Sequence, residues 1–199
     1  RQVRAGDWAP GQAQLRRLAQ LTCGIVGYGR IGRRSAAKLR QGFGSRVLAY
    51  SRNPPAGDDS VEHVALEALL AQSDIVILHA PLTPDTRHLI NRARLAKLRK
   101  GSLLINVSRG ALVDNDALIE VLANGTLGGA ALDVLETEPE VPEALRSDPR
   151  VILTPHVAFS SDASVAELRR SACEEVVRVL RGQPPLFACN TPHNWNPAA

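Results

Sequence analysis

The stretch LTCGIVGYGRIG, residues 21–32, decides the fold predicted for this chain of 199 residues. Its apolar first part predicts a buried strand over 21–27, and its second part carries the pattern G-x-G-x-x-G at Gly27, Gly29 and Gly32. After a strand and before a helix, the first glycine permits a tight turn, the second lets a pyrophosphate approach the backbone, and the third allows close packing. The helix start supplies N–H groups for phosphate. We therefore expect a dinucleotide-binding strand–turn–helix unit.

Outward from this turn, apolar strands alternate with helical segments along the chain. Further strands are predicted over 46–50, 74–79, 103–107, 128–134 and 151–154. Helices are predicted over 31–41, 66–71, 89–98, 114–123 and 161–180, and a surface tail over 183–199. The strands are apolar without alternation, as buried parallel strands are. The pattern therefore predicts an α/β fold, a doubly wound, mainly parallel Rossmann sheet with helices on both faces.

The composition excludes several classes of protein. Hydrophobic residues make up 44% and charged residues 22%, as in globular domains, and the longest apolar runs are too short to cross a bilayer. The three cysteines form no CxxC pair, which predicts neither a metal site nor a disulfide framework but reduced thiols in a cytoplasmic protein. The net charge is +4, yet the arginines are scattered and aromatic residues reach only 4%. Nucleic-acid binding is therefore not expected.

The end of the second predicted strand bears on the choice of dinucleotide. An acidic residue there would accept a hydrogen bond from the ribose 2′-hydroxyl of NAD. This chain has Ser51 and Arg52 instead. A hydroxyl can donate to a phosphate, and a guanidinium fork can hold one. The sequence therefore favours NADP, with NAD as the alternative.

Four later motifs, together with the glycine turn, give the sequence a family resemblance. They are LHAPLT at 78–83, NVSRG at 106–110, ALDV at 131–134 and TPH at 154–156. With these motifs in this order, the chain resembles the D-2-hydroxyacid dehydrogenase family over almost its whole length. The resemblance implies an oxidoreductase that transfers a hydride between a nicotinamide dinucleotide and a D-2-hydroxy acid or its 2-oxo acid. The expected substrate is a 2-oxo acid such as glyoxylate, hydroxypyruvate or a bulkier analogue.

The resemblance also implies three catalytic residues. Arg109 would hold the substrate carboxylate and the adjacent carbonyl oxygen with its planar fork. His156 would give a proton to the developing alkoxide during reduction and take it back during oxidation. Glu138 lies in the acidic run Glu136-Thr137-Glu138-Pro139-Glu140, which by spacing alone is typical of a solvated loop. The family pattern instead gives Glu138 the role of orienting the His156 ring and favouring its charged form.

Further residues are expected to line the cofactor cleft. Asp133 ends a strand and resembles the family acid that lies near the nicotinamide carboxamide. The others expected there, besides the three glycines, Ser51 and Arg52, are Arg30, Ile31, Ala80, Pro81 and Ser108.

A binding module is the alternative function. The family includes dinucleotide-sensing corepressors, the C-terminal binding proteins, and residues 154–159 resemble theirs in the aromatic residue after the histidine. The corepressor branch keeps the catalytic residues too, so these do not separate the two readings. The absence of an acid at Ser51 argues against that branch.

The family pattern also predicts the organisation of the chain. Residues 1–157 are expected to form the dinucleotide-binding domain with an N-terminal linker, and residues 158–199 a C-terminal helix and tail that belong to or contact the substrate domain. The resemblance leads us to expect that about 100 N-terminal residues of the usual enzyme precede this chain's first residue, and the chain contains no Met. We therefore expect this chain alone to bind dinucleotide but to turn over little substrate. A homodimer is expected from the family.

Overall fold

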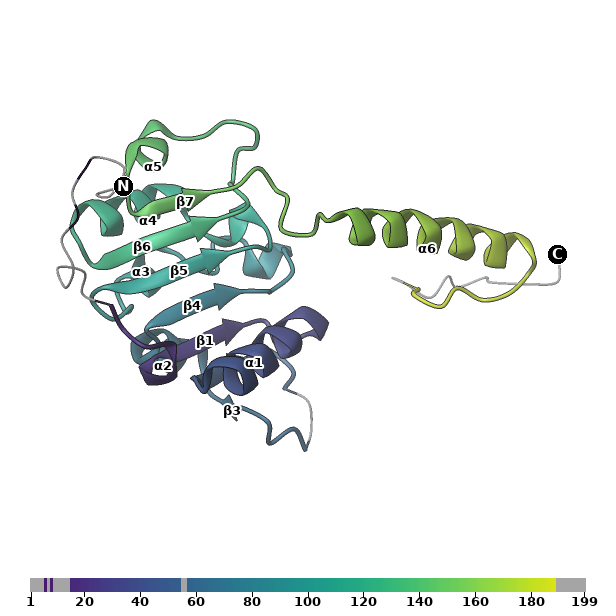
Figure 1. Cartoon of the computed structure of the whole chain (residues 1–199), viewed down its shortest axis with the longest axis horizontal. Coiled ribbons are helices and arrows are strands. Elements are labelled where there is room, and N and C mark those ends of the chain that lie inside the picture. Colours follow the sequence, from purple (N-terminus) through teal and green to yellow (C-terminus); the bar gives the residue numbers. More distant parts are fainter. Residues whose placement is uncertain (1–5, 7, 9–14, 55–56, 189–199) are drawn as a thin grey trace. The chain divides into compact units, whose positions relative to one another are not determined.

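The computed structural model describes residues 6, 8, 15–54 and 57–188 of the chain. The chain divides into two compact units, Arg1–His156 and Val157–Ala199. The larger unit contains a seven-stranded sheet with the order β3-β2-β1-β4-β5-β6-β7, drawn as arrows in Figure 1. Every neighbouring pair of strands is parallel. The predicted α/β fold with a doubly wound sheet is therefore confirmed.

The six predicted strands are all present, and the glycine turn follows the first of them, β1. The strands are β1 (Thr22–Val26), β2 (Arg46–Tyr50), β3 (Glu62–His63), β4 (Ile75–Leu78), β5 (Ser102–Asn106), β6 (Leu127–Leu132) and β7 (Val151–Leu153). In the register, Gly24 of β1 lies opposite Leu48 of β2 and Val76 of β4. The sequence did not predict β3, because two residues carry no hydrophobic pattern.

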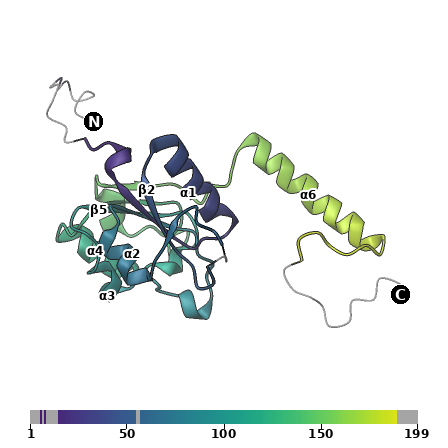
Figure 2. The same cartoon turned by 90° about the horizontal axis from the view of Figure 1, so that it is seen from below.

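Helices cover both faces of the sheet. The helices of the larger unit are α1 (Arg30–Phe43), α2 (Leu66–Gln72), α3 (Arg92–Leu95), α4 (Asn115–Ala123) and α5 (Glu143–Ser147). Figures 1 and 2 together show α1 on one face and α2, α3 and α4 on the other. Two separate hydrophobic clusters match these faces. Ala36 of α1 packs with Cys23, Ile25 and Val47, whereas the larger cluster joins α2, α3 and α4 to the strands.

Two helical segments differ from the prediction. The segment 89–98 was expected to be one helix, but only the four residues of α3 are helical. The reason lies in its first residues: the Ile90 N–H donates to the Leu112 carbonyl, and the Ile90 carbonyl accepts from Asp114 N–H. Ile90 is thus extended, and the Asn91 side chain caps the helix by accepting from Arg94 N–H. The five-residue helix α5 was not predicted, because it is too short for a helical repeat.

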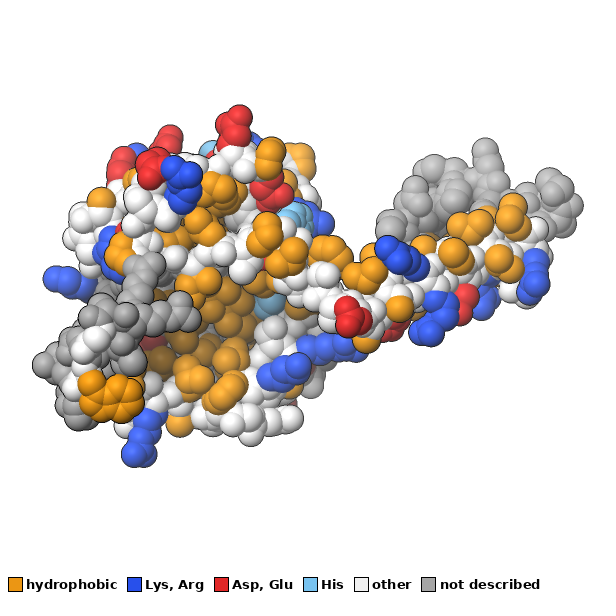
Figure 3. All heavy atoms as spheres, turned by 45° about the horizontal axis from the view of Figure 1, so that its top comes forward, with side chains coloured by type: hydrophobic (Ala, Val, Ile, Leu, Met, Phe, Trp, Pro, Cys, Tyr) orange, Lys and Arg blue, Asp and Glu red, His pale blue; other side chains and the backbone are white. Residues whose placement is uncertain are grey.

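The face of the sheet on which α1 packs is less covered by helices near β5 and β7. Leu103 and Ile152 are 40% and 66% exposed, although Leu104 on the other face is buried. Figure 3 shows hydrophobic side chains gathered on the surface of the larger unit. A parallel sheet is normally buried on both faces, so this apolar face is unusual within the part of the chain that the structure describes.

The smaller unit consists of one long helix and the segment after it. Helix α6 (Asp162–Leu180) begins with a capping box, in which the Ser161 hydroxyl accepts from Ser164 N–H and the Ser164 hydroxyl accepts from Ser161 N–H. Of the tail expected over 183–199, residues 183–188 contain neither helix nor strand, and the rest lies outside the described residues. Among the described residues, no helix combines the length and apolar character needed to cross a membrane.

Candidate active site

The expected site residues lie at one edge of the sheet because the strands are parallel. Gly27 follows β1, Ala80 follows β4, Ser108 follows β5, Asp133 follows β6 and His156 follows β7. All are therefore at the carboxyl edge. The sheet order changes direction between β1 and β4, and such a switch point is where open α/β sheets bind ligands.

The glycine turn leaves backbone accessible beside the start of α1. Gly27 has φ +98°, and a Cβ there would overlap the backbone of His79 and Ala80. A Cβ on Gly32 would overlap the Gly27 carbonyl, which shows how closely helix and turn pack. Gly29 differs, because a Cβ there would meet nothing within 4 Å. The turn therefore has open space at Gly29, next to the first N–H groups of the helix.

A cavity of about 440 Å³ lies between the ends of β2 and β4. Arg52 lines this cavity, and its guanidinium forms a 3.2 Å ion pair with Asp85, which also lines the cavity. The Ser51 hydroxyl donates to the Asn53 carbonyl at 3.2 Å. Ser51, Arg52, Ala80 and Pro81 all line the cavity, together with Gly27.

A second cavity, of about 350 Å³, lies at the start of α1 and includes a histidine that the sequence did not single out. It is lined by Gly29, Arg30, Ile31, Arg34 and His79. The His79 Nε2 lies 3.0 Å from the Ser35 hydroxyl. Burial lowers the pKa of His79, which favours the neutral form of this imidazole. The only sequence feature that could have pointed to His79 as a site residue is its position in the LHAPLT motif.

The end of β5 is organised by a buried asparagine. The Asn106 side chain donates to the Arg109 carbonyl at 2.9 Å and accepts from Ser108 N–H at 3.1 Å. The Ser108 hydroxyl donates to the Ala80 carbonyl, which joins β5 to β4. Arg109 itself is exposed, and its guanidinium donates to the Ser108 carbonyl. Asn106 therefore fixes the backbone from which Arg109 projects, a role that the sequence did not predict.

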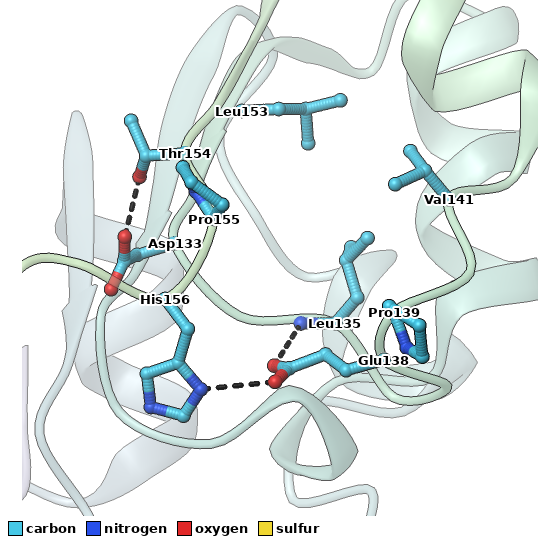
Figure 4. Close-up of a pocket in the computed structure, with 9 residues that line it drawn as sticks. All are labelled: Asp133, Leu135, Glu138, Pro139, Val141, Leu153, Thr154, Pro155 and His156. Carbon is cyan, nitrogen blue, oxygen red and sulfur yellow. Dashed lines mark hydrogen bonds and ion pairs between the residues drawn. The ribbon is translucent and has the colours of Figure 1, made fainter.

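His156 and Glu138 lie together beside a pocket of about 340 Å³ (Figure 4). The His156 Nδ1 is 2.9 Å from Glu138 Oε2, and the other carboxylate oxygen accepts from Leu135 N–H at 3.0 Å. A carboxylate can only accept, so Nδ1 carries the proton and donates it. The second ring nitrogen, Nε2, points away from Glu138. This nitrogen is thus available to gain or lose a proton.

Electrostatics favour an ionised carboxylate in this pair. The hydrogen bond with His156 holds the pKa of Glu138 below its usual value, with a smaller contribution from the Leu135 N–H. Burial and the charge of Asp133 act in the opposite direction. The ionised carboxylate therefore accepts the Nδ1 proton and orients the imidazole ring.

Asp133 fixes the backbone of His156. Asp133 is only 5% exposed and accepts a 2.6 Å hydrogen bond from the Thr154 hydroxyl. Its carbonyl accepts from His156 N–H at 2.8 Å. His156 has φ +55°, a conformation that a non-glycine residue keeps only when its surroundings fix it. Thr154, part of the TPH motif, is thus a positioning residue whose role the sequence did not predict.

The structure thus brings some of the expected residues together and separates others. Asp133, Glu138 and His156 line one pocket, whereas Arg109 lies at the end of β5 and is not among the residues that line it. The glycine turn and the Ser51–Arg52 pair lie at two other cavities of the same sheet edge.

Comparison with known proteins agrees with this arrangement. Residues 1–158 match the family model of the D-isomer specific 2-hydroxyacid dehydrogenase NAD binding domain. A glycerate dehydrogenase from Methylorubrum extorquens is 38% identical over 191 residues, which cover 92% of this chain and 59% of that protein. A glyoxylate reductase from Thermococcus litoralis is 36% identical over 193 residues, covering 92% and 58%.

A solved structure gives the same result. The TT0316 protein from Thermus thermophilus superposes with a TM-score of 0.86 at 38% identity, covering 95% of this chain and 61% of that one. The chain therefore spans about 60% of the length of these relatives. The extent of the family match, the shared fold and the arrangement at the sheet edge together identify this chain as a member of the D-isomer specific 2-hydroxyacid dehydrogenase family, corresponding to its NAD binding domain.

Proposed function

We propose that the protein transfers a hydride between a nicotinamide dinucleotide and a D-2-hydroxy acid or its 2-oxo acid. The observation that carries this proposal is the 2.9 Å pair of His156 and Glu138 at the carboxyl edge of a dinucleotide-binding sheet. Family membership and the printed activities of the relatives, glycerate dehydrogenase and glyoxylate reductase, support it. No observation on the described residues favours the corepressor-type binding module.

The residues around the glycine turn fit a dinucleotide. The space beside Gly29 and the start of α1 suit a pyrophosphate, because a side chain at that position would occupy the space. Ser51, Arg52, Ala80 and Pro81 would hold the adenosine part, and Ser108 and Asp133 would face the nicotinamide part. When bound, the nicotinamide supplies or accepts the hydride at the substrate carbon.

The other residues supply binding and a proton. Arg109 projects from the end of β5 and would hold the substrate carboxylate with two N–H groups, orienting the neighbouring carbonyl. The protonated His156 ring, oriented by Glu138, would donate from Nε2 to the carbonyl oxygen as negative charge develops there. In the reverse direction the neutral ring accepts that proton from the 2-hydroxyl group.

The direct test is turnover by the full-length protein with a series of 2-oxo acids. We expect loss of reduced-nicotinamide absorbance with glyoxylate, hydroxypyruvate or bulkier 2-oxo acids, and none with a matched series of carboxylic acids that lack the oxo group. Tight dinucleotide binding without turnover of any 2-oxo acid would refute the enzymatic proposal and favour a sensing module.

We further propose that NADP is the preferred dinucleotide, with NAD as the alternative. Arg52 lines the cavity between β2 and β4, and among the described residues its guanidinium forms an ion pair with one exposed partner, Asp85. Exposed pairs of this kind are weak, so a ribose 2′-phosphate can displace the Asp85 carboxylate from the fork. Ser51 offers a hydroxyl beside it.

Replacement of Arg52 by alanine should therefore separate the two dinucleotides. Loss of a charge-assisted contact to phosphate costs about 1.5–3 kcal/mol, so NADPH should bind roughly tenfold to hundredfold more weakly while NADH is nearly unaffected. Calorimetric titration of both cofactors measures this. Arg34, which lines the cavity beside Gly29 instead, provides the control, since Arg34→Ala should not discriminate between them. An equal loss for both cofactors in Arg52→Ala would contradict the assignment.

Three wider expectations stay predictions of this proposal. Residues 158–199 are proposed to belong to or contact a substrate domain. The protein is proposed to form a homodimer and to act in the cytoplasm.

A further inference from the structure

The loop that carries Glu138 is held by a second acidic residue, Glu136. Glu138 has a half-exposed side chain and projects from the loop that follows β6. Its carboxylate accepts from Leu135 N–H, which belongs to the same loop. That bond orients the carboxylate within the loop but does not fix the loop against the sheet edge. A different contact is needed for that.

Glu136 makes such a contact with a segment 49 residues earlier in the chain. Its carboxylate accepts from His88 Nε2 at 2.8 Å and from the Arg87 guanidinium at 2.5 Å. The Glu136 side chain is only 17% exposed, unlike the side chain of an ordinary surface ion pair. The last acid in the run, Glu140, is exposed. Glu136 therefore has an environment that its neighbours in the sequence do not share.

The Arg87-His88 segment that contacts Glu136 is itself held in place by other contacts. His88 has φ +49°, which is unfavourable for a residue with a side chain. Its N–H donates to the Ala111 carbonyl at 2.7 Å, which ties the segment to the backbone just after Arg109. The cost of that conformation is offset by the contacts at both ends of His88: the backbone bond to Ala111 and the ring bond to Glu136.

The backbone after Arg109 also touches the loop directly. A Cβ on Gly110 would overlap the Leu135 carbonyl, so only a glycine permits this approach. Three segments therefore meet at one junction: Arg87-His88, Gly110-Ala111 and Leu135-Glu136. Two of them lead directly into residues of the proposed site, Arg109 and Glu138.

We propose that Glu136, held by Arg87 and His88, is a positioning residue that places the Glu138 carboxylate against His156. The proposal rests on the proposed function, in which His156 transfers a proton and Glu138 supports its charged form. Among the described residues, the hydrogen bonds and ion pairs of the Glu136 side chain are with Arg87 and His88 and not with Glu138 or His156, so Glu136 acts through the loop.

The positioning role and a simple charge effect predict opposite shifts in the pH at which the His156 ring loses its proton, and this difference is the basis of the test. Among the described residues that line the pocket beside His156, the acidic groups are Glu138, paired with the ring, and Asp133, whose charge acts on Glu138. Removal of the positive Arg87 and of His88 by Arg87→Ala/His88→Ala should, by charge alone, let the His156 ring keep its proton to higher pH. If the pair positions Glu138, its removal frees the loop, and the ring should lose its proton at lower pH.

Histidine NMR on the 199-residue chain follows this titration without any need for turnover. Glu138→Gln sets the scale, because it removes the partner carboxylate while keeping its shape. We expect Arg87→Ala/His88→Ala and Glu136→Ala each to reproduce at least half of the Glu138→Gln displacement. The control is Glu140→Ala, which removes an equal charge equally close to Glu138 in sequence and should leave the titration unchanged. If the double variant does not fold, as judged by its melting transition, Arg87→Gln gives the same comparison.

The outcomes separate this proposal from the proposed function. A displacement to higher pH, or none, in the double variant would overturn the positioning role of Glu136. In the full-length enzyme, Glu136→Ala should lower kcat severalfold to about tenfold and move the basic limb of the reduction profile to lower pH, with KM for the dinucleotide unchanged. If the enzyme turns over no 2-oxo acid at all, the proposed function fails, and the NMR result still decides the role of Glu136.

Discussion

Replacement of His156 by alanine is expected to lower kcat for 2-oxo acid reduction by about 10²–10⁴, the usual contribution of general acid–base catalysis. The imidazole is half-exposed and packs in neither hydrophobic cluster, so its loss should leave the fold intact. KM should change little, because the substrate carboxylate is assigned to Arg109. Steady-state kinetics of the full-length protein at saturating dinucleotide measure both constants.

Two companion variants sharpen this test. His156 has φ +55°, and asparagine adopts that conformation more readily than alanine does, so His156→Asn controls for backbone strain. It should lose as much kcat as His156→Ala. Arg109→Ala should differ from both: KM for the 2-oxo acid should rise roughly tenfold to hundredfold, and kcat should fall as well, because the carbonyl is no longer oriented. A His156 variant that keeps kcat within a factor of about three would remove this residue from proton transfer.

The core of the fold could be predicted from the sequence because it rests on local patterns. Six apolar strands separated by helical segments have one common solution, a parallel sheet with helices on both faces. The glycine spacing then places the first turn. The sequence missed β3 and α5, which are too short to show a period, and overextended α3, where Ile90 pairs with a distant segment instead of joining the helix.

The site was less predictable, as the acidic run shows. Glu136, Glu138 and Glu140 are the same residue type at a spacing of two, yet the structure gives them three environments. Glu136 is mostly buried against Arg87 and His88, Glu138 pairs with His156, and Glu140 is exposed. These differences depend on contacts between segments far apart in the chain, which spacing does not encode. The family resemblance singled out Glu138 but gave no reason to separate Glu136 from Glu140.

The glycine turn allows a matched pair of substitutions, of which one should lower the stability of the fold and the other the affinity for dinucleotide. Gly27→Ala should destabilise the fold, because alanine at φ +98° costs about 1–2 kcal/mol and its Cβ would overlap the backbone of Ala80. Displacing that backbone adds an overpacking cost of about 1–3 kcal/mol, so the free energy of unfolding should fall by roughly 2–5 kcal/mol in total. Denaturant unfolding measures this loss directly.

Gly29→Ala should leave the fold intact and impair binding instead. Gly29 has φ −83°, which alanine adopts without strain, and a Cβ there meets nothing within 4 Å, so stability should change by less than about 1 kcal/mol. The new methyl group would occupy the space through which a pyrophosphate approaches the start of α1. We therefore expect the Kd for NADPH and the Kd for NADH to rise at least about tenfold. The rise should be equal for both, because the two dinucleotides share the pyrophosphate and differ only at the ribose 2′ position. Normal dinucleotide affinity in Gly29→Ala would show that the pyrophosphate does not lie against this turn, because the open space at Gly29 would then have no part in binding.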